Sequence, residues 1–291
     1  MNPNTTKILI QTQHKEKTMN QQSTLTLAGI PETMLITLWA KAIESQHKNP
    51  IIKDEKASEL IQQIDYDFNK FKRSAFSQVG IATRAKLIDD ETLAFINKHS
   101  QAIIIQIGAG LDTRFYRLGC PSHIVWYDID VSMAMAYRSK LIAPQDNVHM
   151  LDFSMLDKEW VAYIQNKDLP ILVIVEGVLM YFDESKVRQF FDLLCDNFNH
   201  LEVVFDMLYY KGVGNVKKTD AVSKTKDQPE YLWSMLNSRD IEHWHHKIHF
   251  VKEYHMSDYY GNRCPFPFNL LYKLPYFYKN FNQRVVKLEL Y

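Results

Sequence analysis

The sequence is poor in cysteine, carries no net charge and contains no long apolar run, and each shortage removes a class of protein. Its three cysteines, Cys120, Cys195 and Cys264, are far apart and never spaced as CxxC, so neither a disulfide framework nor a zinc site is implied. Lys plus Arg and Asp plus Glu both number 34, so no net field attracts nucleic acid or an anionic membrane. No run approaches the roughly 18 apolar residues of a membrane span, and the first residues lack the apolar core of a signal peptide. We therefore expect a cytoplasmic protein with no nucleic-acid or membrane partner.

The remaining composition is that of a globular chain. With 291 residues, 46% of them hydrophobic, the chain can bury a sizeable core as one elaborated domain or as one domain plus a cap. Residues 1–23 are polar and have little to bury, so we predict a flexible leader, with Met19 as an alternative start. Helical periodicity over residues 24–99 predicts a helical cap, whose aromatic residues could cover a ligand pocket or simply form core: Trp39, Tyr66, Phe68, Phe71 and Phe76. Residues 100–291 are the predicted α/β domain, with a polar insertion at about 210–239 and a helix at its end.

The chain is organised around the stretch IIIQIGAG at residues 103–110. Its continuous apolar run predicts a strand buried on both faces, which ends in the tight turn Gly108-Ala109-Gly110. An α/β fold uses such a joint to bring bare backbone N–H groups up to a nucleotide-like ligand, although many strand-to-helix turns need glycine for packing alone. About twenty residues later, IVWYDID predicts a second strand ending in Asp130, where a carboxylate can bind both hydroxyls of a ribose. This spacing suits one βαβ unit.

The residues of the turn do not match the pattern that NAD-binding folds use. A dinucleotide fold wants a third small residue, as in GxGxxG, and this chain has Thr113 after Gly108 and Gly110, which weakens an NAD-dependent reading. Instead GAGLDTR and the later EGVLMYF resemble the leucine carboxyl methyltransferase family, which includes bacterial tetracenomycin polyketide-type O-methyltransferases, over about residues 41–205. The resemblance implies an S-adenosyl-L-methionine cofactor. It also implies a Rossmann-like, mostly parallel sheet of seven strands, the last antiparallel, behind an N-terminal helical cap.

The same resemblance assigns cofactor contacts to particular residues. Arg84 matches an arginine that contacts the carboxylate of the methionine moiety, and Lys41 aligns less well; a solvated helix-face arginine is the alternative. Asp130 matches the ribose contact, and Asp152-Phe153 the acid and apolar ring at the adenine, although Asp152 could equally cap a helix. Glu176 follows the buried run 171–175, in the crevice where open α/β sheets bind ligands, and matches an acid beside the cofactor. Gly108, Ala109 and Gly110 complete the predicted cofactor site.

Neighbouring polar residues have local explanations. Asp112 and Thr113 at the head of the next helix are expected to cap its free N–H groups, and Arg114 and Arg117 to be structural. Asp128 is expected to form a surface salt bridge. Strands are further expected at residues 147–152, 202–207, 249–256 and 284–290, the last two as an antiparallel hairpin.

The histidine-rich run HWHHKIHF invites a metal site, which we do not predict. A helix would place His245 and His249 on one face, but no acid or cysteine completes a ligand set at a familiar spacing. We favour a half-exposed helix followed by the start of a strand.

The expected activity is O-methylation of a small-molecule carboxylate or hydroxyl, with no assigned catalytic residue. The sulfonium already activates the methyl group, so an ionised carboxylate needs no base, whereas a phenol, with a pKa of about ten, would benefit from one. Tyr181 either lines the methyl-transfer site or packs. The alternatives are a methyltransferase for a protein C-terminal carboxylate, a silent cofactor-binding regulatory protein, and an NAD-dependent oxidoreductase. The sequence does not decide the oligomeric state.

Overall fold

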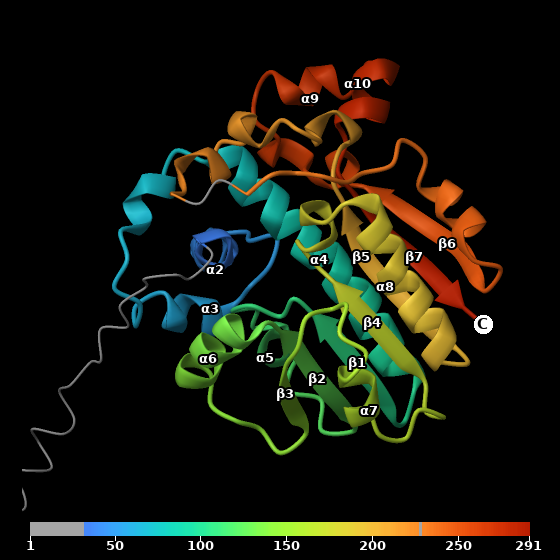
Figure 1. The fold of residues 1–291 in the computed structure, drawn as a ribbon. Helices are drawn as coiled ribbons and strands as arrows, with labels where there is room; N and C mark the ends of the chain where they lie inside the picture. The colour runs from blue at the N-terminus through green and yellow to red at the C-terminus, as the bar shows by residue number, and fades with distance from the viewer. Residues whose placement is uncertain (1–31, 227–228) are drawn as a thin grey trace, which may run out of the picture.

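The computed structural model describes residues 32–226 and 229–291 and has one seven-stranded sheet (Figure 1). The predicted leader, Met19 and the start of the predicted cap lie outside the described residues. The sheet order is β3-β2-β1-β4-β5-β7-β6. The strands are β1 (Ala102–Ile107), β2 (Ile124–Asp130), β3 (Val148–Asp152), β4 (Ile171–Val175), β5 (Leu201–Met207), β6 (Ile248–His255) and β7 (Arg284–Leu290). The first five pair in parallel, and β7 lies antiparallel between β5 and β6. The predicted Rossmann-like methyltransferase sheet is confirmed.

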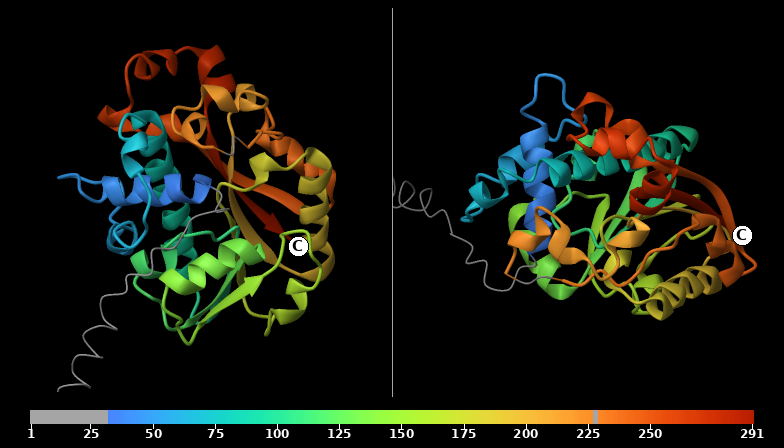
Figure 2. Two further views of the ribbon diagram at one scale, coloured as in Figure 1. Left: turned by 60° about the vertical axis from the view of Figure 1, so that its left-hand side comes forward. Right: turned by 90° about the horizontal axis from the view of Figure 1, so that it is seen from above.

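Helices cover both faces of the sheet because its central strands are apolar on both faces. In β1, Ile103 and Ile105 face one core with Phe190 and Leu194 of α8 (Glu184–Asn197). Ile104 faces the other core, with Ile88 of α4 (Ala75–Lys98). Figure 2 shows α4 and α8 on opposite sides of the strands. This alternation explains why the buried strands appear in the sequence as continuous apolar runs.

The helices that precede β1 are α2 (Glu32–Glu44), α3 (Glu55–Leu60) and the long α4. The first two and the N-terminal half of α4 lie over the carboxyl ends of the strands, whereas the rest of α4 covers one face of the sheet. Leu35 and Leu38 of α2 and Leu60 of α3 pack in one cluster with Leu111, which directly follows the glycine turn. Among the described residues before β1, no strand occurs, as expected. The boundary that we predicted between cap and α/β domain, at residues 99 and 100, stays a prediction.

Two connections after β5 depart from their expected form. The polar segment after β5 consists of 3₁₀ turns, and its predicted final helix is a 3₁₀ segment at Ser238–Trp244. β6 and β7 are antiparallel neighbours, but residues 256–283 join them through α9 (Phe268–Leu271) and α10 (Pro275–Phe281) rather than through a tight turn. Short elements also complete the first half of the domain: α5 (Arg114–Arg117), α6 (Ser132–Leu141) and α7 (Trp160–Tyr163). No helix among the described residues has the length and apolarity needed to cross a membrane.

Candidate functional site

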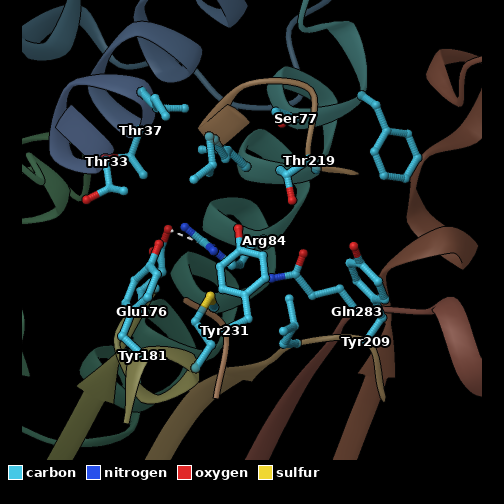
Figure 3. Close-up of a pocket in the computed structure, with 18 of the residues that line it drawn as sticks. Thr33, Thr37, Ser77, Arg84, Glu176, Tyr181, Tyr209, Thr219, Tyr231 and Gln283 are labelled. Carbon is cyan, nitrogen blue, oxygen red and sulfur yellow. Dashed lines mark hydrogen bonds and ion pairs between the residues drawn. The ribbon is translucent and has the colours of Figure 1, made fainter. Parts of the chain in front are cut away.

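A cavity of about 520 Å³ lies at the carboxyl ends of the central strands, beneath α2 and the N-terminal half of α4. The segments after β5 and between β6 and β7 complete its wall. Five of the eight predicted cofactor residues line it: Arg84, Gly108, Ala109, Gly110 and Glu176. In Figure 3, Arg84 and Glu176 point toward one another, with Tyr181 and Tyr231 beside them and Tyr209 farther to the right, beyond Gln283. Of the cap aromatics proposed to cover a pocket, Phe76 alone is among its lining residues, whereas Trp39 and Phe71 belong to the core.

The glycine turn is built differently from the bare N–H cradle that the sequence suggested. The N–H groups of Gly108 and Ala109 donate to the Ile129 carbonyl, at 2.7 and 3.2 Å, and so fasten the end of β1 to β2. Gly108 has φ +65°, and a Cβ there would lie 2.1 Å from Cγ2 of Val178. A glycine is therefore required at residue 108 by the backbone and by a neighbouring side chain, whether or not a ligand is present.

Glu176 follows β4 and is held between two arginines. Its Oε1 accepts from Nε of Arg84 at 3.1 Å, and its Oε2 accepts from Nη2 of Arg114. The carboxylate is only 6% exposed. Burial opposes its ionisation, but the positive charges of Lys41, Arg84 and Arg114 outweigh burial and lower the pKa of Glu176 to about 2. Glu176 is therefore a buried anion at neutral pH.

Arg84 is positioned by a second acid that the sequence analysis did not identify. Asp206, near the end of β5, accepts from Nη1 of Arg84 at 3.0 Å. The same oxygen accepts from the side-chain amide of Gln283, just before β7, at 3.0 Å, and the other oxygen of Asp206 accepts the Gly177 N–H at 2.6 Å. Asp206 is 1% exposed, so burial raises its pKa even though Arg84 opposes that rise. One carboxylate thus fixes both the arginine and the turn that carries Glu176.

These groups belong to one buried ion network. Salt bridges connect nine residues whose side chains are each no more than 10% exposed. They are the cations Lys41, Arg84, Arg114 and Arg117 and the acids Asp54, Asp89, Asp112, Glu176 and Asp206. With four cations and five acids, the network carries one formal negative charge in excess. Such an excess favours a ligand with a net positive charge.

Two local predictions fail because the residues concerned have charged partners elsewhere in the fold. Asp112 and Thr113 do not cap the following helix: Asp112 binds Lys41 at 2.6 Å, and the Thr113 hydroxyl donates to Asp54. The prediction of a surface salt bridge at Asp128 is also wrong, because Asp128 and Arg138 form a fully enclosed pair at 2.6 Å. Burial raises the pKa of Asp128 despite Arg138. In each case tertiary packing supplies a charged partner that local spacing does not reveal.

The other three predicted residues lie along the neighbouring edge of the sheet and do not line this cavity. Asp130 and Asp152 are register partners at the ends of β2 and β3. Asp130 accepts the N–H groups of Gly110 and Val131, each at 2.8 Å, and burial raises its pKa. Asp152 is exposed, and the ring of Phe153 lies 5.4 Å from that of Tyr163. Because Gly110 both lines the cavity and donates to Asp130, the two groups of residues adjoin at the glycine turn.

The histidine-rich run forms no metal centre in the part of the chain that the structure describes. His245 lies after the 3₁₀ segment and His249 lies within β6, so a common helix face does not exist. Among residues 32–226 and 229–291, no group of three or more His, Cys, Asp or Glu is placed to hold a metal ion.

Comparisons with known proteins concern the family and the fold of the chain. The model of the leucine carboxyl methyltransferase family matches residues 34–195. The tetracenomycin polyketide synthesis O-methyltransferase TcmP of Streptomyces glaucescens is 26% identical over 81% of this chain and 86% of its own. The S-adenosyl-L-methionine-dependent methyltransferase dpfgK of Gibberella zeae is 29% identical over 56% of this chain and 59% of its own. The crystal structure of a candidate methyltransferase from Thermobifida fusca superposes with a TM-score of 0.57 at 13% identity, over 88% of this chain and 94% of that one, and so shares the fold.

Proposed function

The chain belongs to the leucine carboxyl methyltransferase family of S-adenosyl-L-methionine-dependent methyltransferases, and from this premise we propose that it methylates an oxygen atom of a small molecule. The acceptor is a carboxylate or a hydroxyl. The observation that carries the proposal is the buried pair Arg84–Glu176, which lines a cavity of about 520 Å³ at the carboxyl ends of the strands.

We assign the predicted cofactor residues to successive parts of the cofactor, from the methionine carboxylate to the adenine. Nη2 of Arg84 lies beside Gly177, while Nε and Nη1 of Arg84 hold the acids, so Nη2 is available to the methionine carboxylate. Glu176 receives the ammonium group. Asp130 receives the ribose hydroxyls, and Asp152 and Phe153 the adenine, at the more exposed edge of the sheet. The cofactor has one net positive charge, which complements the single negative excess of the ion network.

When bound, the cofactor supplies an activated methyl group, and the protein supplies position and a water-poor site. The ion network fixes Arg84 and Glu176 before any ligand arrives, so little reorganisation remains. Tyr181 and Tyr231, whose ring centroids are 5.7 Å apart, line the part of the cavity next to Arg84. They restrict how an acceptor can approach the methyl group. No residue of the chain is assigned as a nucleophile or a base.

Transfer of a labelled methyl group tests this function. We expect the purified protein to bind S-adenosyl-L-homocysteine in calorimetry and to label small-molecule acceptors, giving base-labile methyl esters from carboxylates and base-stable ethers from hydroxyls. No binding of S-adenosyl-L-methionine or its demethylated product at millimolar concentration would refute the proposed site. Label found instead on a protein, and lost when the last residue of that protein is removed, would favour a C-terminal carboxyl methyltransferase.

A further inference from the structure

Exposed apolar side chains are concentrated in one short stretch of the connection between β6 and β7. Fifteen large apolar side chains of the described residues are exposed, and five of them fall within residues 266–276, in α9 and α10 or just before them. These five are Phe266, Phe268, Leu270, Leu274 and Tyr276, with exposed fractions from 39% to 77%. Figure 1 shows α9 and α10 together at the end of the molecule opposite α7. Such a concentration of exposed apolar side chains is typical of an interaction surface.

The start of the segment after β5 continues this surface. Tyr209 is stacked on Phe281 of α10, with 6.3 Å between the ring centroids. Two of the next four side chains, Tyr210 and Val213, are apolar and exposed. We call residues 210–213 and 266–279 together the rim.

The unpaired charges of the rim are all lysines. Lys211, Lys273 and Lys279 are exposed, and none of them forms an ion pair with a described residue. No Asp or Glu occurs in residues 207–219 or 259–288. The rim therefore presents positive charges and apolar side chains on the same two stretches of chain.

The acids that come next along the chain are held in hydrogen bonds. Asp258 accepts from the Tyr278 hydroxyl at 2.7 Å. Asp220 accepts the N–H groups of Phe76 and Ser77, at the start of α4, each at 3.2 Å. Even with both acids counted, the three lysines leave the rim with an excess of positive charge.

We propose that the rim docks the protein on an anionic lipid surface. Aromatic and leucine side chains enter the boundary between headgroups and acyl chains, while lysines extend their charged ends to the headgroups. Each lysine near an anionic leaflet strengthens binding roughly fivefold. The equal totals of acidic and basic residues in the whole chain argue against a field of the entire molecule, and the rim is a local exception to that balance.

The composition of the rim disfavours two other occupants. Lysine is depleted at protein–protein interfaces, where arginine is the enriched cation, and the rim contains no arginine. A second copy of the chain, bound symmetrically through the rim, would bring the same lysines of both copies together. An anionic lipid surface suits the lysines and the apolar side chains at once.

Docking through the rim brings the cavity next to the lipid. Lys211 and Phe268 of the rim also line the cavity, as do Tyr209 and Phe281 beside it. The proposal concerns attachment to a surface, so it goes beyond methyl transfer and does not depend on it.

Sedimentation with lipid vesicles tests this proposal. The full-length protein is mixed with sucrose-loaded vesicles of phosphatidylcholine, either pure or with about 30% phosphatidylglycerol, in about 0.1 M salt. We expect the protein to bind the anionic vesicles at least about tenfold more tightly than the neutral ones. Raising the salt to about 1 M, where the screening length falls to about 3 Å, should remove most of that difference.

Paired lysine variants locate the contact. Lys273→Gln combined with Lys279→Gln should weaken binding to the anionic vesicles by at least about tenfold. The matched control, Lys158→Gln combined with Lys167→Gln, removes two exposed lysines beside α7, at the opposite end of the molecule, and should leave binding unchanged. Leu270 is 52% exposed, so Leu270→Ser should weaken vesicle binding several-fold and leave the midpoint of urea unfolding unchanged.

Three results would overturn the proposal. The first is no binding of the wild-type protein to the anionic vesicles, or an equal loss of binding in both lysine pairs, which would report only the net charge. The second is retention on poly-L-glutamate without vesicle binding, which would indicate an acidic protein partner. The third is a dimer in sedimentation velocity that Leu270→Ser abolishes, again without vesicle binding, which would indicate a second copy of the chain.

Discussion

Replacing Glu176 with glutamine tests the centre of the proposed site, because this single change removes a charge and preserves the shape of the side chain. Glu176 is 6% exposed and contacts Arg84 and Arg114, so the variant leaves both guanidinium groups short of one counter-charge. Removing one partner of a buried ion pair costs about 3–5 kcal/mol of stability. Hydrogen bonds to charged groups contribute about 1.5–3 kcal/mol. Loss of the contact to the ligand ammonium should therefore weaken S-adenosyl-L-homocysteine binding by roughly 10- to 100-fold.

A control with an equally buried carboxylate separates binding from folding. Glu44 is fully buried and pairs with Arg263 at 2.8 Å, and it does not line the cavity. Glu44→Gln should lower the midpoint of urea unfolding but leave calorimetric affinity for S-adenosyl-L-homocysteine unchanged. Glu176→Gln should lower both. A folded Glu176→Gln variant that binds with wild-type affinity would refute the assignment of Glu176 to the ammonium group.

Four further outcomes follow from the same contacts. Asp206→Asn should weaken S-adenosyl-L-homocysteine binding roughly tenfold by loosening Arg84, raising KM for S-adenosyl-L-methionine more than it lowers kcat; an unchanged KM would contradict the positioning role. Gly108→Ala should destabilise the protein by about 2 kcal/mol or more in urea unfolding, and adding Val178→Ala should recover part of that loss, because the clash is with Cγ2 of Val178. The pKa of Glu176 is about 2 in the folded state against an ordinary 4.5, so the folded form binds fewer protons between these values, and its stabilising effect, complete above pH 4.5, should fall as the pH drops toward 2. Urea unfolding between pH 3 and 6 should show a weaker pH dependence for Glu176→Gln than for the wild type, and equal slopes would show that the charge is not buried as described. His246→Ala should leave binding unchanged, because His246 is exposed and outside the cavity, and an altered affinity in calorimetry would reopen the role of the histidine run.

Much of the sheet is predictable because parallel strands buried on both faces require continuous apolar sequence. The runs at 103–107 and 171–175 lie in β1 and β4. Because Glu176 directly follows β4, it lies at the carboxyl edge of the sheet. The predicted cofactor residues of the glycine turn, together with Arg84 and Glu176, meet in one cavity. Their roles toward the cofactor remain proposals.

The ion-pair partners of these residues could not be predicted from the sequence. Asp112 follows the glycine turn, and spacing suggested a helix cap, yet its partner Lys41 lies 71 residues earlier in the chain. Arg114 was expected to be structural, and it contacts Glu176 across 62 residues. The aromatic lining of the cavity likewise comes from residue 76 and from residues 209–281, whose apolar side chains have no periodic pattern that would reveal a shared surface.

The sequence alone therefore determined where the strands lie along the chain, and which acids and glycines stand at their ends, because these features depend on local burial and turn geometry. The tertiary structure decided which charges neutralise one another, that Gly108 is confined by Val178, and that aromatic rings from three distant segments line one cavity. Those outcomes arise from contacts between segments that only the folded chain brings together, where a buried charge must find a partner wherever packing places one.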